Sequence, residues 1–183
     1  NTLVVDVDET LVHSSFSPMT TPDFVFPFKP DNQDIYDKKK NTKNDTNDPE
    51  LIISVRIRPF AEQFISELSN YYEIIIFSNF GKNYTDEILS HIDPDHKVKY
   101  TLYQDSILEF NGTPVKDLSL LGRDLNRTII VDNHQASYLL QPYNAIQVTT
   151  WYRNKKDTEL QKIMKFLIEN HKVTDIYSIL VQK

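Results

Sequence analysis

The chain has 183 residues, of which 39% are hydrophobic, and a formal net charge of -6. This length and hydrophobic content suit one globular domain with a core of its own. The negative charge offers no basic face for a phosphate backbone, so we expect no direct nucleic-acid ligand. The sequence contains no cysteine, which excludes disulfides, thiolate zinc sites and cysteine nucleophiles. No hydrophobic run approaches the roughly 20 residues of a membrane span.

The chain begins at Asn1, without Met and directly in a predicted strand. This start favours an excised domain whose flanking segments carry any targeting signal or anchor. We expect a monomer, located in the nucleus or the cytoplasm.

Four short hydrophobic runs have the length and β-branched content of strands that are buried on both faces. They are Leu3 to Val5, Ile74 to Phe77, Thr128 to Val131 and Ile146 to Thr149. Helical patterns separate or follow these runs, so the alternation predicts an α/β fold with a parallel sheet flanked by helices.

Hydrophobic side chains recur at helical spacing in three segments. One helix is predicted after Pro59, a second over Tyr84 to Ile92, and a third with Asp157 as its cap and Leu160 to Leu167 as its buried stripe. A last short helix is predicted over Thr174 to Leu180.

Residues 14–57 interrupt this alternation after the first strand. The runs Phe24 to Phe28 and Leu51 to Ile57 predict a small antiparallel β insertion. The segment that joins them, 31–49, is rich in Asn, Asp, Lys and Thr, and we expect a solvated, mobile loop. A second interruption contains Asn111-Gly112 between hydrophobic flanks, which predicts a hairpin.

Polar side chains follow three of the predicted strands. Asp6 and Asp8 follow the first strand, Ser78 the second, and Asp132 with Asn133 the third. Two carboxylates on one face of an extended strand would repel each other, so we expect the chain to turn at Asp6. Since ligands bind at the carboxyl ends of parallel strands, these groups are expected to meet at one edge of the sheet.

Such a cluster has the parts that phosphoryl transfer needs. Asp6, an oxygen of Asp132 or Asn133 and a backbone carbonyl are hard ligands of the kind that Mg²⁺ prefers. With the charge neutralised, Asp6 can attack phosphorus and form an aspartyl-phosphate. Asp8 can protonate the leaving oxygen if its pKa is raised above that of Asp6.

Two further side chains can hold the phosphate, and one competing interpretation stays open. Ser78 and Lys116 can donate to the equatorial phosphate oxygens. Alternatively, the two carboxylates belong to a surface turn in which Thr10 caps a helix and Asp8 and Glu9 are solvated.

The D-x-D-x-T run Asp6 to Thr10 and its flanks resemble the small CTD phosphatase branch of the haloacid-dehalogenase (HAD) superfamily, also called NLI-interacting-factor-like phosphatases. Further matching segments follow in the family's order. They are Arg58-Pro59, Val115 to Ser119, Leu121 to Leu125, Val131 to Asn133, Asn144 to Ile146, Trp151 and Asp157 to Leu160. The resemblance covers nearly the whole chain and implies a HAD-like domain.

The resemblance implies a Mg²⁺-dependent phosphatase acting on phosphoserine or phosphothreonine. It implies that Asp6 is the nucleophile and a metal ligand, and that Asp8 is the acid/base whose backbone carbonyl also binds the metal. The intact first motif separates the chain from related mitochondrial import receptors, in which that motif has degenerated and which serve in binding.

The other implied roles are structural or bind the phosphate and the metal. Thr10 is implied to position the loop, Ser78 and Lys116 to hold the phosphate, and Asn133 to ligate the metal with the support of Asp132.

In small CTD phosphatases the insertion forms a hydrophobic pocket for a proline of the RNA polymerase II C-terminal repeat. Phe16, Phe28 and Ile53, with Tyr84 near the edge, either line such a pocket here or form the insertion's own core.

Three positions depart from the family pattern. Gly81 stands where a larger hydrophobic side chain is expected, Gln104 where a basic residue usually lies, and Ile57 replaces the Lys before Arg58. Losing a basic group weakens one way of binding a phosphopeptide. A different substrate, as for Dullard-like phosphatases that act on a lipid phosphatase, is therefore one open alternative. A catalytically silent binding protein of the mitochondrial import-receptor kind is the other.

Overall fold

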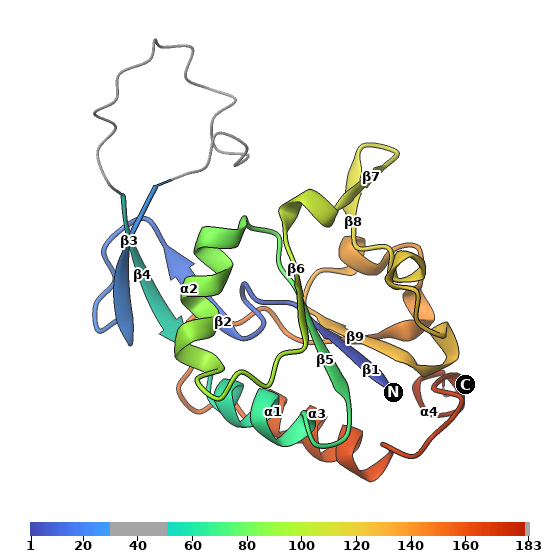
Figure 1. Ribbon diagram of the computed structural model, residues 1–183. Helices are drawn as coiled ribbons and strands as arrows, with labels where there is room; N and C mark the ends of the chain where they lie inside the picture. The colour runs from blue at the N-terminus through green and yellow to red at the C-terminus, as the bar shows by residue number, and fades with distance from the viewer. Residues whose placement is uncertain (30–50, 182–183) are drawn as a thin grey trace.

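The centre of the molecule is a parallel β-sheet. The structure, a computed structural model, describes residues 1–29 and 51–181, so the loop predicted at 31–49 lies outside the described residues. In this part of the chain the sheet has five strands in the order β10-β9-β1-β5-β6 (Figure 1). Their bounds are β1 Thr2–Val5, β5 Glu73–Phe77, β6 Tyr100–Leu102, β9 Thr128–Asp132 and β10 Ala145–Gln147. The predicted parallel α/β sheet is confirmed.

The central strands are hydrophobic throughout because both faces of the sheet are covered. Leu3 and Val5 of β1 belong to the larger core, which the helices complete. Val4 points to the opposite face, where Ile130 of β9 and Leu118 join it in a second core. Since successive side chains of a strand alternate between faces, a two-sided core requires an uninterrupted hydrophobic run.

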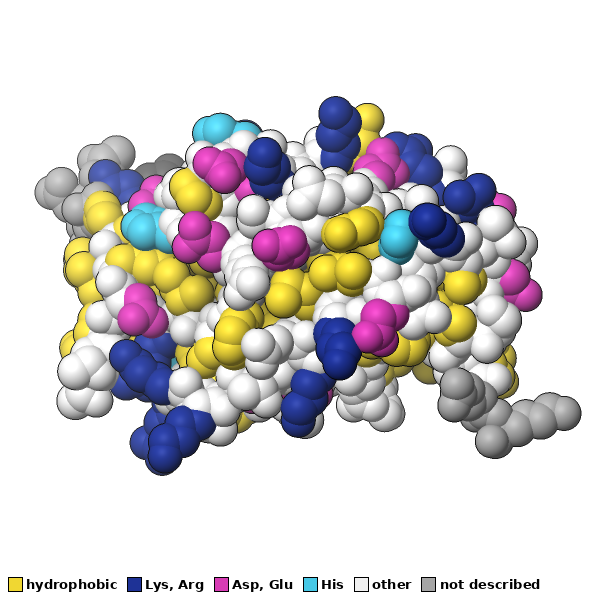
Figure 2. All heavy atoms as spheres, turned by 90° about the horizontal axis from the view of Figure 1, so that it is seen from below, with side chains coloured by type: hydrophobic (Ala, Val, Ile, Leu, Met, Phe, Trp, Pro, Cys, Tyr) yellow, Lys and Arg dark blue, Asp and Glu magenta, His cyan; other side chains and the backbone are white. Residues whose placement is uncertain are grey.

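Within residues 1–29 and 51–181, four α-helices pack on the face of this sheet that carries the larger core. They are α1 Ala61–Leu68, α2 Lys82–Ile92, α3 Glu159–Glu169 and α4 Tyr177–Leu180. Helices α1 and α3 pack side by side below the sheet in Figure 1, each through four buried residues: Ala61, Phe64, Ile65 and Leu68 of α1, and Leu160, Ile163, Met164 and Leu167 of α3. Figure 2 views the molecule from this side and shows charged side chains of both signs scattered over it. The helices are therefore amphipathic elements with a solvated outer face.

Several predicted boundaries differ from the structure, most clearly three near the C-terminal end of the chain. The last strand ends at Gln147, because the Thr149 backbone N–H donates to Glu159 rather than to a neighbouring strand. The cap of α3 is Thr158 rather than Asp157, although the Asp157 carboxylate still accepts the Glu159 N–H at 3.1 Å. The final helix is only Tyr177–Leu180.

A small antiparallel sheet packs beside α2. It contains β2 Val12–Ser15, β3 Phe24–Phe28 and β4 Leu51–Ile57, in the order β2-β4-β3. The pairing of β3 with β4 follows the sequence prediction, whereas β2 was not predicted as a strand.

A hairpin and several 3₁₀ helices complete the described chain. The hairpin joins β7 Leu108–Phe110 to β8 Thr113–Val115 through Asn111 and Gly112, both at positive φ, as a tight hairpin turn requires. The 3₁₀ helices are η2 Gln104–Ser106, η3 Leu118–Leu121, η4 Leu125–Arg127, η5 Gln135–Tyr138 and η6 Pro142–Asn144. Among the described residues, no helix has the length and apolar character needed to cross a membrane.

Candidate active site

The chain leaves β1 at Asp6 and forms a tight loop. The Asp6 backbone N–H still donates to the Val131 carbonyl at 3.0 Å, as a strand residue would. The backbone N–H groups of Leu11 and Val12 then both donate to the Val7 carbonyl, at 2.8 and 3.1 Å. The predicted turn is present, and it buries the side chains of both Asp6 and Asp8.

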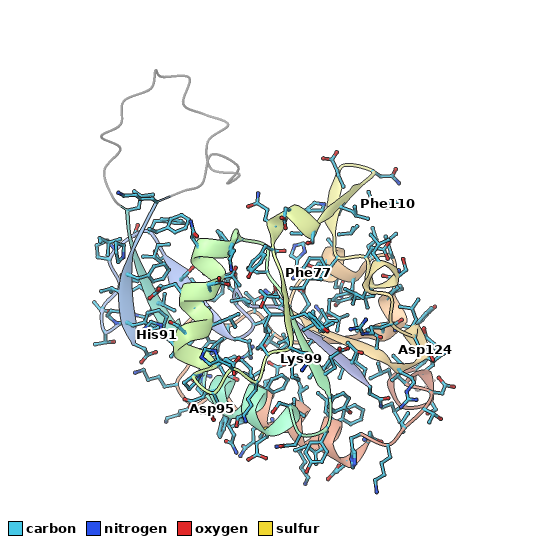
Figure 3. The ribbon with its side chains drawn as sticks, viewed as in Figure 1. Phe77, His91, Asp95, Lys99, Phe110 and Asp124 are labelled. Atoms are coloured by element: carbon cyan, nitrogen blue, oxygen red, sulfur yellow. The ribbon has the colours of Figure 1, made fainter. Side chains whose placement is uncertain are left out.

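A buried lysine joins two carboxylates at the end of the sheet. Lys116 follows β8, and its Nζ donates to Asp6 Oδ1 at 2.6 Å and to Asp132 Oδ2 at 2.8 Å. The Nζ also lies 5.6 Å from the ring centroid of Phe77, which Figure 3 labels at the end of β5. Lys116 and both carboxylates are each 1% exposed. Because Asp8 adds a third buried carboxyl, one ammonium group faces three acidic groups.

The second oxygen of Asp6 is held by Thr10. The Thr10 hydroxyl lies 2.8 Å from Asp6 Oδ2 and 3.4 Å from Asn133 Oδ1. Asn133 Nδ2 donates to Thr150 Oγ1 at 3.1 Å, which turns the amide oxygen toward Thr10. Thr10 is thus part of the carboxylate cluster and does not cap a helix, so the competing surface-turn interpretation is wrong for Thr10 and for the buried Asp8.

Asp8 has one bonded and one unbonded oxygen. The Tyr84 hydroxyl donates to Asp8 Oδ1, and the same hydroxyl oxygen lies 2.8 Å from Ser14 Oγ. Asp8 Oδ2 is the one buried side-chain nitrogen or oxygen without a hydrogen-bond partner within residues 1–29 and 51–181. A buried oxygen without a partner is costly, and such atoms mark places where a ligand or a proton is needed.

Burial raises the pKa values of the two carboxyl groups of the loop, Asp6 and Asp8, to different extents. Burial raises the pKa of Asp6 to about 6, against the lowering effect of the Lys116 ammonium. Burial raises the pKa of Asp8 to about 8, although the hydrogen bond from Tyr84 acts in the opposite direction. This is the order that a carboxylate nucleophile and a carboxylic acid donor require.

Ser78 lies at the same edge of the sheet. It follows β5, which ends at Phe77. Because Ile76 of β5 pairs in register with Val5 of β1, Phe77 lies level with Asp6 and Ser78 lies one residue further along. Its buried Oγ accepts from the Phe80 backbone N–H at 3.1 Å and from the Thr85 hydroxyl at 2.9 Å. Both contacts use the oxygen as acceptor, which leaves the hydroxyl proton to donate.

The structure places the four predicted substrate residues at different depths. Ile53 and Tyr84 are fully buried, Phe28 is 6% exposed, and Phe16 is 38% exposed with its ring 6.2 Å from that of Phe28. Three of them therefore belong to the core under the insertion, and only Phe16 is open to solvent. A role of this group in binding substrate stays a prediction.

The three departures from the family pattern lie in ordinary structural positions. Gly81 precedes α2 as its cap, Gln104 begins η2, and the Ile57 backbone N–H donates to the Asp23 carboxylate at 2.7 Å. None of these contacts replaces the basic group whose loss the sequence indicated.

Sequence reasoning missed the bond between Tyr84 and Asp8. The two residues are 76 positions apart, and Tyr84 lies on a helix whose spacing indicates only a buried face. No local pattern reveals such a contact, because it depends on how α2 packs against the loop after β1.

The donor set fits a small hard cation. Among the described residues there is no group of three or more His, Cys, Asp or Glu side chains arranged to hold a metal ion. Mg²⁺ does not require such a cage, because it is usually bound by one or two carboxylates and keeps waters and phosphate oxygens as its other ligands. Asp6 Oδ2 and Asn133 Oδ1 approach the same hydroxyl, and the buried acidic groups outnumber the one buried ammonium.

The fold and the position of this cluster define the class of protein. The five-stranded parallel sheet with its helices, and the loop after β1 that carries both aspartates, give a HAD-like α/β fold. The structure is similar to that of Fcp1, an essential RNA polymerase II CTD phosphatase, with a TM-score of 0.61 and 19% identity over 93% of this chain and 50% of that chain. Fission yeast Fcp1 gives a TM-score of 0.62 at 19% identity over 98% and 53% of the two chains. At this identity the likeness concerns the fold.

The chain belongs to the NLI interacting factor-like phosphatase family, whose model matches residues 1–177. A probable C-terminal domain small phosphatase of Dictyostelium discoideum is 38% identical over 98% of this chain and 53% of its own length. The human carboxy-terminal domain RNA polymerase II polypeptide A small phosphatase 1 is 35% identical over 98% of this chain and 63% of its own length. A CTD small phosphatase-like protein 2 of Dictyostelium discoideum is 36% identical, and the chain spans 28% of it. The family resemblance seen in the sequence is confirmed.

Proposed function

We propose that this chain is a protein serine/threonine phosphatase domain that acts through an aspartyl-phosphate on Asp6. The observation that carries the proposal is the pair of buried carboxyl groups at the end of β1. Asp6 is held by Lys116 and Thr10, while Asp8 presents an oxygen without a partner. A fixed nucleophile beside an acid with a raised pKa is the arrangement that a two-step displacement needs.

In the first step a carboxylate oxygen of Asp6 attacks phosphorus, and the bond from phosphorus to the serine or threonine oxygen breaks. Asp8 transfers its proton to that leaving oxygen. In the second step water attacks phosphorus, gives a proton to Asp8, and releases inorganic phosphate and the Asp6 carboxylate. Asp8 is therefore deprotonated after the first step, as the second step requires, and protonated again after the second.

The phosphate oxygens need positive and polar partners while charge develops on them. Lys116 and Ser78 are suited to donate to these oxygens, since both lie at the edge of the sheet near Asp6. Asp132 orients Lys116 from the other side at 2.8 Å.

A magnesium ion would be held by Asp6, Asn133 and the backbone carbonyl of Asp8. When bound, it supplies positive charge that lets an anionic carboxylate approach an anionic ester. This assignment is supported by the donor set and by the excess of buried acidic groups over Lys116.

As substrate we propose phosphoserine in the C-terminal repeats of RNA polymerase II. The support is the relatives, which are named as CTD small phosphatases, together with the exposed ring of Phe16 against Phe28 at the insertion.

The reaction is tested by the hydrolysis of an aryl phosphate with and without Mg²⁺. We expect turnover that EDTA abolishes and Mg²⁺ restores, and we expect Asp6→Asn to lower kcat by about 10³-fold or more with an unchanged circular dichroism spectrum. Turnover of Asp6→Asn at the wild-type rate would refute the mechanism.

The substrate is tested separately with a panel of phosphopeptides that includes the C-terminal repeat phosphorylated at each serine. We expect at least one repeat peptide to exceed a scrambled phosphoserine peptide in kcat/KM. If none does, the polymerase assignment is wrong while the chemistry at Asp6 still stands.

A further inference from the structure

The Tyr84 hydroxyl is the point where three separate elements meet. Tyr84 lies in the first turn of α2, Asp8 in the loop after β1, and Ser14 on β2 of the small sheet. The residue is 1% exposed, so water does not compete for these bonds. A buried hydroxyl that reaches a carboxyl group from another element constrains how that group can rotate.

The direction of the hydrogen bonds follows from the number of protons. A phenol has one proton, and Tyr84 uses it to donate to Asp8 Oδ1. Because that proton is engaged, the 2.8 Å contact between Ser14 Oγ and the Tyr84 oxygen requires the serine hydroxyl as its donor. The chain of donors therefore runs from Ser14 through Tyr84 to Asp8.

This direction decides which oxygen of Asp8 can carry a transferable proton. Oδ1 already accepts a proton from Tyr84, so an added proton belongs on Oδ2. Oδ2 is also the buried oxygen without a partner. Oδ1 thus anchors the carboxyl group of Asp8 to Tyr84, and Oδ2 is the oxygen that can donate a proton.

The ring of Tyr84 is fixed as firmly as its hydroxyl. Its centroid lies 4.4 Å from that of Phe80, 6.1 Å from Phe26 and 6.2 Å from Phe28. These neighbours come from β3 and from the turn before α2, so the ring is packed on several sides. A packed ring with a bonded hydroxyl has little freedom to swing away from Asp8.

We infer that Tyr84 is a positioning residue for Asp8: its hydroxyl, supported by Ser14, fixes one carboxyl oxygen so that the other presents the proton to the leaving group. The inference rests on the proposed phosphatase chemistry and adds to it a link between the small sheet and proton donation. It also gives Tyr84 a task different from lining the substrate pocket.

The test uses the dependence of the rate on the leaving group. A serine alkoxide is a poor leaving group and needs the proton of Asp8, whereas 2,4-dinitrophenolate leaves without one. We expect Tyr84→Phe, which keeps the ring, to lower kcat with a phosphoserine peptide by about 10- to 100-fold. With 2,4-dinitrophenyl phosphate, the rate constant of aspartyl-phosphate formation should fall less than about threefold in the same variant. The burst phase measures this rate constant.

Two further variants complete the experiment. Tyr72→Phe is the matched control, because Tyr72 is also buried and its hydroxyl donates to the Leu167 carbonyl at 2.8 Å away from the site. It should leave the ratio of the two rates unchanged. Ser14→Ala removes the support of Tyr84 and should lower the phosphoserine rate selectively but less than Tyr84→Phe, which tests the same link if Tyr84→Phe folds poorly.

Equal losses with both substrates, or no loss with either, in the Tyr84 and Ser14 variants would overturn the inference while leaving the phosphatase proposal intact. Absence of Asp6-dependent turnover in the wild-type protein would instead remove the proposed function, and the inference with it.

Discussion

Two buried cations, Lys116 and Arg58, flank the loop that follows β1, and their surroundings differ. Lys116 contacts two carboxylates at the end of the sheet, next to the unpartnered oxygen of Asp8. Arg58 is also fully buried, and all three of its guanidinium nitrogens donate. Nε and Nη2 reach the Asp157 carboxylate at 3.0 and 3.1 Å, and Nη2 also reaches Glu159 at 2.8 Å.

The Arg58 cluster also reaches the backbone. The Arg58 Nη1 donates to the carbonyls of Thr10 and Thr149, at 3.2 and 3.0 Å. The same threonine that fixes Asp6 through its hydroxyl is therefore held from behind by Arg58 through its carbonyl. The Glu159 carboxylate in turn accepts the Thr149 backbone N–H. The donors and acceptors around Arg58 are matched within the protein.

This difference in hydrogen-bond matching distinguishes the Arg58 cluster, which is structural, from the Lys116 cluster, which is reactive. A buried polar network that is fully matched holds elements in place. A buried network with an unmatched oxygen and an excess of negative charge is destabilising unless a ligand completes it. We therefore expect changes at Arg58 to affect mainly stability, and changes at Lys116 to affect mainly turnover.

The largest expected effect is that of Lys116→Met on the rate. We expect kcat for a phosphoserine peptide to fall by about 10³-fold, because the donor to the phosphate oxygens and to Asp6 is lost. Stopped or continuous phosphate-release assays measure this. Lys165→Met is the matched control, since Lys165 forms an exposed pair with Glu169. A Lys116 variant with near wild-type kcat would contradict the reactive role of the Lys116 cluster.

Arg58→Met is expected to lower the free energy of unfolding by about 3 kcal/mol, because it leaves Asp157 and Glu159 without their buried partner. In urea unfolding the midpoint should fall, while kcat of the folded protein stays within about tenfold of wild type. The control is Arg123→Met, whose solvent-screened pair with Glu73 should shift the midpoint much less. Loss of kcat with unchanged stability would contradict the structural role of Arg58.

Asn133→Ala sharpens the contrast at the reactive cluster. We expect the Mg²⁺ concentration for half-maximal activity to rise by about 10- to 100-fold, because an oxygen beside Asp6 is removed. Magnesium titrations of the initial rate measure the shift. Thr150→Ala, which only releases the amide of Asn133, should give a smaller shift. An unchanged magnesium requirement in Asn133→Ala would remove this residue from the metal site.

The smallest expected effect is the pH dependence of stability at Asp157. Burial alone would raise its pKa, but the hydrogen bonds from Arg58 and the Glu159 backbone outweigh burial and hold the pKa below its usual value. A lowered folded-state pKa means that Asp157 stabilises the protein above its unfolded pKa of about 3.9, and that this contribution is lost as the pH falls through the folded value.

Asp157→Asn should therefore be less stable than wild type by about 1 kcal/mol at neutral pH. The difference should shrink in urea unfolding series carried toward acid. A constant difference from pH 7 down to acid would contradict the role of its charge.

Sequence patterns predicted the central sheet well and the cluster at its edge in part. The runs around Leu3, Ile74 and Ile129 are strands because β-branched residues buried on two faces leave few other structures open to them. The short strand β2 was missed because Val12 to Ser15 has no alternating pattern, and its pairing with β4 is a tertiary event. The cap of α3 was misplaced because Asp157 serves Arg58 as well as the helix.

The sequence by itself determined the types of group at the site and their order along the chain. Asp6 and Asp8 are two positions apart after a hydrophobic run, so a turn there is a local consequence of strand geometry and charge repulsion. Only the tertiary structure decided how far each group is buried and what it contacts. Lys116 lies 110 residues from Asp6, and Tyr84 lies 76 residues from Asp8. Such contacts arise from packing between distant elements, and burial there sets both the acidity of the carboxyl groups and the oxygen that is left to react.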